Sequence, residues 1–254
     1  MTLMREIVAS GEASHLVAER VWQETARALA EQSPWVYFEI LQQCDALNVL
    51  FPELNALFGI PQPELYHPEI DTGIHSLMSL QAACRLSDDI NVRFAALIHD
   101  LGKGLTPMPD WPKHHGHEKK GLSPIKAMCK RLKAPNDVRT LSLLAGEFHT
   151  HVHRAFELKA ATVLKVIKSS DAFRNSERFH QFLLVCEADA KGRTGFEEKE
   201  YPQRQYFLDS FSAAKSVQAS TLIKQGFSGK ELGLALQRSQ QASIQHLKQS
   251  HSQE

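Results

Sequence analysis

The sequence has few cysteines, and those it has are far apart. Cys44, Cys84, Cys129 and Cys186 form no C-x-x-C pair. A zinc knuckle and a redox-active dithiol both use closely spaced pairs, so neither is indicated. We interpret the four residues as reduced, mostly buried thiols, as is typical of a cytoplasmic protein.

Long hydrophobic runs and an excess of one charge are also lacking. No apolar segment is long enough to cross a bilayer. Arg5 and Glu6 interrupt the first residues, so no secretory leader and no membrane partner are predicted. The 29 Lys and Arg residues balance the 29 Asp and Glu residues, so bulk charge does not favour a nucleic-acid partner, although a local patch can still bind one.

Strand signals are weak, because no alternating apolar and polar run is bounded by hairpin turns. Helical spacing of apolar residues instead predicts an all-α protein. The prolines of 59–63 predict a linker, and Pro52 predicts a break or a helix start. The Gln- and Ser-rich tail 237–254 predicts a solvated last helix or a partly disordered segment. The predicted helices are 19–30, 35–43, 47–58, 74–86, 90–101, 121–133, 136–151, 160–169, 176–192 and 201–217.

Histidine is unusually frequent, with thirteen in the chain. His99 and Asp100 lie at the end of the predicted helix 90–101. Helical spacing places His99 on one apolar face with Val92 and Ala95, which directs its ring inward. Two adjacent polar side chains at a buried helix end need partners, and a metal ion is one such partner. For this dipeptide alone, a hydrogen-bonded core histidine beside a helix-terminal aspartate is the commoner arrangement.

The residues around this dipeptide exclude two other motifs. A P-loop needs a glycine and a hydroxyl residue where the sequence has Leu97 and Gly104. The zincin motif H-E-x-x-H, started at His117, needs a second histidine where the sequence has Gly121. Gly102 and Gly104 are expected to end the helix, so that substrate can approach.

Two further polar residues, like His99 and Asp100, each lie near one end of a predicted helix. His75 lies at the start of the predicted helix 74–86, and Asp189 lies between two alanines near the end of an apolar predicted helix. Taken singly, each is more simply explained as a capping or surface residue. Together with His99 and Asp100, they resemble the H…HD…D pattern of the HD superfamily of metal-dependent phosphohydrolases.

This resemblance implies a helical bundle in which four side chains converge on one divalent metal ion. The implied ligands are His75, His99, Asp100 and Asp189. Two histidines and two aspartates suit Ni, Mn, Co, Fe or Zn, with Mg as a further candidate. Lys103, within a sequence similar to the family's HDxGK, is expected to contact a phosphate and to act in catalysis with His99 and Asp100.

Other polar residues are weaker candidates for this site. His117 lies four residues before a glycine, as in HD proteins with additional metal or phosphate contacts, and His149 occupies a similar later position. Arg193 follows Asp189 closely. These three are expected to bind a second metal ion or a phosphate. The histidines expected to be solvated, or to lie outside the direct ligands, are His114, His115, His151 and His153.

A longer resemblance covers roughly residues 3–235. Stretches such as YHPEIDTGIHSLM, VRFAALIHDLGKGLTP and CEADAKGRTGFE resemble the C-terminal part of gammaproteobacterial CCA-adding enzymes (tRNA nucleotidyltransferases) that carry an HD domain. This resemblance implies a neck-type, RNA-binding-like segment 1–62, an HD domain 63–196 and a helical tail 197–254. The chain departs from the family in having no D-x-D pair and no E-D-x-x-R motif. We therefore do not expect this chain alone to add CCA.

The implied activities are those of a 2′,3′-cyclic phosphodiesterase, a 2′-nucleotidase and a phosphatase, in tRNA 3′-end processing or repair. The expected partners are tRNA or its 3′ end and nucleotides with a 2′- or 2′,3′-cyclic phosphate, and homo-oligomerisation is left open. Residues 113–133 carry seven Lys or Arg and one acidic residue, which indicates either a solvated face or a surface for RNA. Two alternatives remain: a non-catalytic tRNA-binding module with a structural HD site, or the partner in a split CCA-adding enzyme.

Overall fold

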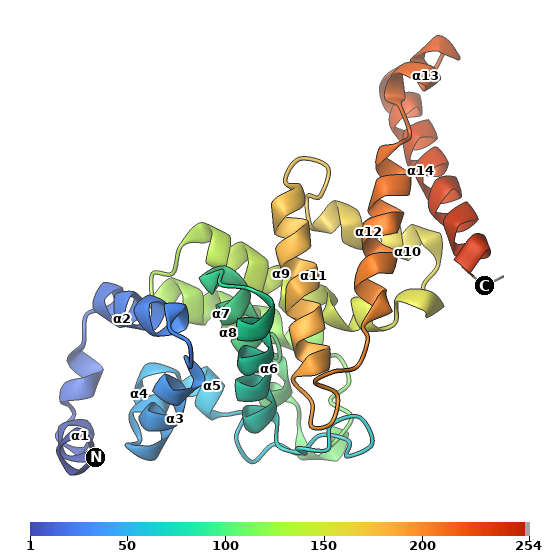
Figure 1. The fold of residues 1–254 in the computed structure, drawn as a ribbon. Coiled ribbons are helices and arrows are strands. Elements are labelled where there is room, and N and C mark those ends of the chain that lie inside the picture. The colour runs from blue at the N-terminus through green and yellow to red at the C-terminus, as the bar shows by residue number, and fades with distance from the viewer. Residues whose placement is uncertain (252–254) are drawn as a thin grey trace. The chain divides into compact units, whose positions relative to one another are not determined.

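The computed structural model of the chain describes residues 1–251, and its regular elements are helical (Figure 1). Within these residues no strand forms, and Pro61 and Asp71 make only an isolated bridge. The predicted all-α class is confirmed. In the same range, no helix combines the length and the apolar character needed to cross a membrane.

The chain divides into two compact units. Unit 1 comprises Met1–His149 with Leu184–Glu200, and unit 2 comprises Thr150–Leu183 and the chain from Tyr201 onward. Both units contain parts of α9 (Asn136–His153) and α11 (Ser176–Lys191). The other elements of unit 1 are α1 (Thr2–Ala9), η1 (Glu12–His15), α2 (Ala18–Ala30), α3 (Trp35–Gln43), α4 (Ala46–Leu50), α5 (Pro52–Asn55), α6 (Thr72–Leu86), α7 (Ile90–Ile98), η2 (Leu101–Leu105), η3 (Met108–Asp110) and α8 (His117–Arg131). Those of unit 2 are η4 (Ala155–Glu157), α10 (Ala160–Ser169), α12 (Pro202–Lys215), α13 (Ala219–Lys224) and α14 (Gly229–His251).

Aspartate caps define where α6 and α7 begin. The Asp71 carboxylate accepts the backbone N–H three residues later at 2.9 Å, and the Asp89 carboxylate accepts the N–H two residues later at 2.8 Å. Such caps satisfy amides that the first helical turn leaves unpaired. Because α6 begins at Thr72, His75 lies in its first turn.

The core of unit 1 packs the N-terminal helices against α6, α7 and α8. Trp22 of α2 meets Phe94 of α7 edge to face, with ring centroids 5.2 Å apart. Arg93, which is buried, donates from Nη1 to the carbonyl oxygens of Leu29 at 2.7 Å and Glu31 at 3.1 Å. These carbonyls lie at the end of α2, where a helix leaves acceptors without intrahelical partners. Arg93 therefore attaches the end of α2 to α7.

Unit 2 has a core of its own, in which α14 packs on α10 and α12. Phe211 of α12 lies against Phe173 and Phe179, with ring centroids 5.5 and 5.4 Å apart. The predicted tail forms the later part of α14 up to His251, and residues 252–254 lie outside the described part of the chain.

Several element bounds differ from the prediction. The α-helix of 90–101 ends at Ile98, and the chain continues as the 3-10 turn η2, so the expectation that Gly102 and Gly104 end this helix is wrong. Helix α8 begins at His117 instead of at 121, directly after Gly116 with φ of 72°. The elements that the sequence did not predict include α1, η1 and α13.

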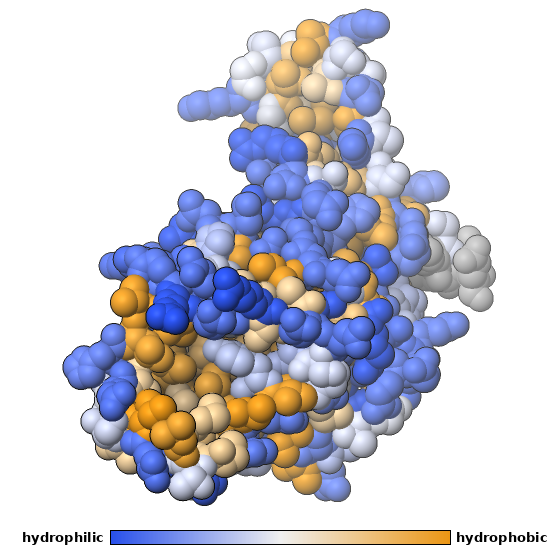
Figure 2. All heavy atoms as spheres, turned by 60° about the vertical axis from the view of Figure 1, so that its left-hand side comes forward, coloured by the Kyte–Doolittle hydropathy of each residue, from blue (hydrophilic) through white to orange (hydrophobic). Residues whose placement is uncertain are grey.

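Apolar side chains are also exposed on the N-terminal helices of unit 1. Figure 2 brings this side forward and shows a broad hydrophobic area on it. The exposed large apolar residues in the first forty positions are Met1, Leu3, Met4, Ile7, Leu16, Val17, Val36 and Ile40. Helices α6 and α7, in contrast, are mostly buried. The candidate site includes the first turn of α6 and the end of α7.

Candidate metal centre

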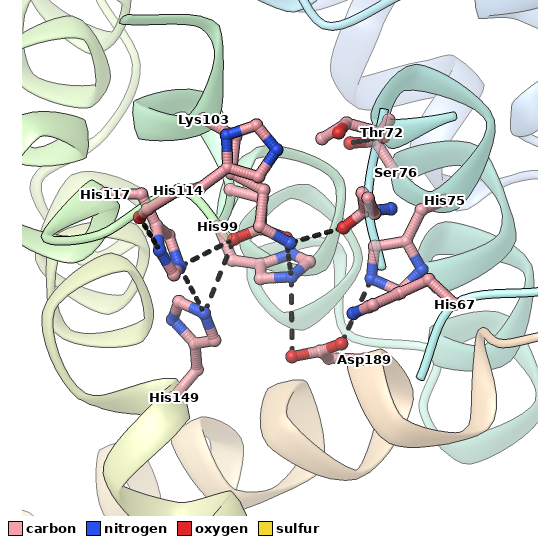
Figure 3. Close-up of polar contacts among 12 residues, drawn as sticks. His67, Thr72, His75, Ser76, His99, Lys103, His114, His117, His149 and Asp189 are labelled. Atoms are coloured by element: carbon pink, nitrogen blue, oxygen red, sulfur yellow. Dashed lines mark hydrogen bonds and ion pairs between the residues drawn. The ribbon is translucent and has the colours of Figure 1, made fainter. Parts of the chain in front are cut away.

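His99 and Asp100 lie where α7 passes into η2. His99 is the C-terminal cap of α7, and its Nδ1 lies 2.8 Å from the carbonyl oxygen of Ala96. With Nδ1–H donated to this carbonyl, Nε2 is the nitrogen left to face the site (Figure 3). Both side chains are almost fully buried.

The Asp100 carboxylate is the centre of the polar contacts. Its Oδ2 lies 2.6 Å from Lys103 Nζ and 3.2 Å from His99 Nε2. Its Oδ1 lies 3.3 Å from His117 Nε2 and 3.4 Å from His149 Nε2. Two elements distant in sequence, α8 and α9, therefore bring histidines to one carboxylate oxygen of the η2 turn.

His117 and His149 are oriented in the same way as His99. His117 Nδ1 lies 3.0 Å from the carbonyl oxygen of His114, and His149 Nδ1 lies 2.9 Å from that of Ala145. Their Nε2 atoms are 3.4 Å apart, and Figure 3 shows the two rings pointing toward one another. Three histidines thus use Nδ1 on a backbone carbonyl and direct Nε2 to the site.

His75 and Asp189 close the other side. His75 Nε2 lies 3.1 Å from Asp189 Oδ1, and His99 Nε2 lies 3.5 Å from Asp189 Oδ2. Arg193, one turn after Asp189, donates from Nη2 to Asp189 Oδ1 at 3.2 Å. The predicted ligands His75, His99, Asp100 and Asp189 are therefore brought together, although His99 and Asp100 follow the last residue of α7 instead of lying within the helix.

Charges at this site shift its proton affinities. Burial alone lowers the pKa of His99, but the carboxylates of Asp100 and Asp189 outweigh it and raise the pKa to about 9. Burial alone raises the pKa of Asp100, but the Lys103 ammonium and His99 outweigh it and hold the pKa well below its usual value. Burial lowers the pKa of His149. Without a cation, the paired carboxylates therefore hold a proton on His99.

Two buried atoms at the centre indicate that a cation fits there. His99 Nε2 and Asp100 Oδ1 have no well-aligned hydrogen-bond partner in the described structure, and unsatisfied buried polar atoms are costly. Four overlapping sets of candidate ligands have their donor atoms within 4.8 Å of one another, and one of them, His67 with Glu69 and His75, lies beside the centre. The other three sets are His75 with His99 and Asp100, His99 with His149 and Asp189, and Asp100 with His117 and His149. Imidazole and carboxylate donors suit a divalent transition metal.

Several polar residues beside the centre were not predicted. Glu69 Oε1 lies 2.9 Å from His75 Nδ1 and 3.0 Å from His67 Nδ1. Gln62 accepts a hydrogen bond from Lys103 Nζ. These residues lie in the 59–71 segment, where irregular structure provides no periodic signal of side-chain direction.

Of the two positions expected for His114, solvated or outside the direct ligands, the structure shows the second. The residue is buried, with Nδ1 2.6 Å from Thr106 Oγ1 and Nε2 2.7 Å from the carbonyl oxygen of Pro61. It therefore connects the segment before α8 to the 59–71 segment. Its neighbour His115 is exposed, as predicted.

Comparison with known families agrees with this fold. The family model described as "HD domain" matches residues 72–182. The one described as "Probable RNA and SrmB- binding site of polymerase A" matches residues 8–58. The chain therefore contains an HD domain, preceded by a segment of the polymerase A RNA-binding type. The predicted boundaries at 62 and 196 stay a prediction.

Whole-chain comparison identifies the relatives. The chain is 52% identical over all its 254 residues to the multifunctional CCA protein of Hahella chejuensis, of which it covers 60%. It is 56% identical over 231 residues to that of Pseudoalteromonas atlantica, covering 91% of this chain and 57% of the relative. It is 52% identical over 248 residues to that of Teredinibacter turnerae, covering 98% and 60%. The resemblance is confirmed: the chain is a homologue of the multifunctional CCA proteins and spans about 60% of the length of these curated relatives.

Proposed function

We propose that the chain is a metal-dependent phosphohydrolase that acts on RNA-like or nucleotide phosphoesters. The observation that carries the proposal is the convergence of His75, His99, Asp100 and Asp189, with two of their buried donor atoms lacking well-aligned partners. The match to an HD domain supports it.

In this proposal His75, His99, Asp100 and Asp189 hold a divalent ion. When bound, such an ion acts as a Lewis acid toward a phosphoryl group and activates water for attack. Asp100 is ionised, because its pKa is held well below its usual value, so its carboxylate is suited to hold the metal ion and to orient the attacking water. His117 and His149 share Asp100 Oδ1, which suits them to a second metal ion or to phosphate contacts.

Lys103 and Arg193 provide positive charge at opposite sides of the ligand set. Each contacts a ligand carboxylate, Asp100 or Asp189, and Lys103 is only 7% exposed. A phosphate that entered the site would meet these cations at short range, where charge-assisted hydrogen bonds are strong. We propose them as phosphate contacts, and Lys103 as a catalytic residue with His99 and Asp100.

The proposed substrates are nucleotides or tRNA 3′ ends that carry a 2′- or a 2′,3′-cyclic phosphate. The relatives are named multifunctional CCA proteins, and α8, which begins at the site with His117, carries exposed basic residues along its length, with Lys119, Lys126 and Lys130 among them. Such a surface attracts a phosphate backbone without reading its sequence. We propose that it guides an RNA end to the centre.

Hydrolysis of 2′,3′-cyclic AMP tests the proposal. Protein loaded separately with Mn, Co, Ni or Zn is expected to open the cyclic phosphate. His99→Ala and Asp100→Ala are each expected to lower the rate of hydrolysis at least about a hundredfold, because each deletes a metal ligand. His115→Ala is the matched control, since this exposed histidine lies in the same region. Absence of turnover with every ion would refute the phosphohydrolase.

A non-catalytic tRNA-binding module is the second candidate. The match of residues 8–58 to an RNA-binding family favours it. Under this alternative, tRNA binds, its affinity falls steeply with salt, and no phosphoester is cleaved. A split CCA-adding enzyme would instead require nucleotide incorporation once its partner is supplied.

A further inference from the structure

The ligand histidines differ in what holds their Nδ1 atoms. In His99, His117 and His149, Nδ1 lies within hydrogen-bond distance of a backbone carbonyl three or four residues earlier. His75 does not follow this pattern, because no backbone carbonyl in the described part of the chain is hydrogen-bonded to its Nδ1. The acceptor within reach of its Nδ1 is a side chain, Glu69, at 2.9 Å.

Glu69 is itself held in place. Its side chain is about as buried as the ligands, at 2% exposed. His67 Nδ1 lies 3.0 Å from Oε1, and the backbone N–H of Thr194 donates to Oε2 at 3.3 Å. The ring of His67 also packs edge to face on that of His75, with centroids 4.6 Å apart. Glu69 therefore connects the segment before α6 to the turn after α11. Helix α6 carries His75, and α11 carries Asp189.

A ligand histidine must present a lone pair, so its second nitrogen carries the ring proton. For His75, Nε2 faces Asp189 and the site, so Nδ1 must be the protonated nitrogen when a metal binds. A carboxylate that accepts this proton fixes the tautomer and raises the basicity of the ligand. The Nδ1–H is not well aligned with Glu69 Oε1, and such contacts often tighten only when the site is filled.

We propose that Glu69 is a positioning residue of the metal centre, which holds the Nδ1–H of His75 and thereby directs its Nε2 to the metal ion. This inference rests on the proposed metal-binding function. It assigns Glu69 no contact with substrate and no role in proton transfer.

Metal affinity of the full chain, measured by competition between the protein and a chromophoric Zn²⁺ chelator, tests this role. Glu69→Ala is expected to bind Zn²⁺ about 10- to 100-fold more weakly than the unmodified protein. Glu69→Gln is expected to lose less, because its amide oxygen can still accept from His75 while its NH₂ opposes the N–H of Thr194. Glu64→Ala, which removes an exposed carboxylate from the same segment, is the matched control and is expected to change nothing.

The tautomer of His75 is a readout that general destabilisation does not move. In ¹⁵N-histidine NMR spectra of the Zn²⁺-loaded protein, His75 is expected to carry its proton on Nδ1. Glu69→Gln is expected to shift the Nδ1 signal of His75 more than the ring nitrogen signals of the other histidines. A His75→Ala spectrum identifies the signal. If Glu69→Ala lowers the thermal midpoint of the metal-free protein, the Glu69→Gln comparison still decides the question.

The two failures are distinguishable. If the unmodified protein binds no divalent ion, the proposed function fails and this inference falls with it. If the unmodified protein binds Zn²⁺, His75→Ala weakens binding and both Glu69 variants bind normally with an unchanged Nδ1 signal, Glu69 has no positioning role although the metal site stands.

Discussion

Metal affinity is expected to depend steeply on pH, because a metal ion and a proton compete for the same atom of His99. Only the unprotonated Nε2 can bind a metal. The charges of Asp100 and Asp189 raise the pKa of this histidine to about 9 in the metal-free protein. Below that pH a metal ion must displace the proton, so affinity falls as the pH falls. Asp100 does not add to this effect, since its pKa lies well below its usual value.

The size of the effect follows from the pKa. With a pKa of about 9, the unprotonated fraction of His99 falls from about one in eleven at pH 8 to about one in three hundred at pH 6.5, so affinity falls about thirtyfold. A histidine with the ordinary pKa of about 6.5 would change affinity only about twofold over this range. About one proton should be released per metal ion bound.

Calorimetric titration with Zn²⁺ or Co²⁺, in two buffers of different ionisation enthalpy, measures the metal affinity and the number of protons released on binding. The released protons are obtained from the difference in heat, and the affinity from competition with a chelator of known pH dependence. An affinity that stays within about twofold between pH 8 and 6.5, with no proton release, would show that His99 is either unprotonated before binding or not a ligand.

Two substitutions test the packing that positions the site. Gly102→Ala would place a Cβ 1.9 Å from the carbonyl oxygen of His117, so we expect a lower thermal midpoint and weakened Zn²⁺ binding. Gly233→Ala is the control, because an added Cβ there meets nothing within 4 Å and alanine favours a helix by about 1 kcal/mol. Arg93→Met removes the hydrogen bonds to the end of α2, so the free energy of unfolding in urea should fall by about 3 kcal/mol, as for lost bonds to a charged group. A loss below about 0.5 kcal/mol would contradict the role given to Arg93.

The helices of this fold were largely predictable, and so was the inward direction of His99. Apolar periodicity locates α6, α7, α10 and α12 to within a few residues because each buries one face. The two glycine positions at the site were misread for one reason. Gly102 was expected to end the helix 90–101 and Gly121 to begin the helix 121–133, whereas Gly102 lies within η2 and Gly121 within α8. A Cβ on Gly102 would lie 2.5 Å from Gly121 N, so close approach of two backbones explains these glycines. No local pattern reveals such a contact between distant segments.

The environment of the site was less predictable than its ligands. Each ligand lies on or beside a helix whose period predicts the direction of the side chain. The order of the four residues along the chain, which resembles the H…HD…D pattern, indicated that they meet at one metal ion. Glu69 and His67 lie between Gly59 and the start of α6, where the chain forms no helix. The same sequence would fit an exposed loop, so only the three-dimensional contact to His75 distinguishes these residues.

The difference between backbone and side-chain acceptors has a consequence for how the centre tolerates substitution. Where a main-chain carbonyl orients a histidine, as for His99, His117 and His149, no side-chain replacement nearby removes the acceptor, and only displacement of the helix can disturb it. His75 instead depends on a carboxylate held by a second histidine and by one amide of another segment. The His75 and Asp189 side of the centre should therefore be the more sensitive to substitutions outside the ligands. The Asp100 side should respond mainly to changes, such as Gly102→Ala, that separate η2 from α8.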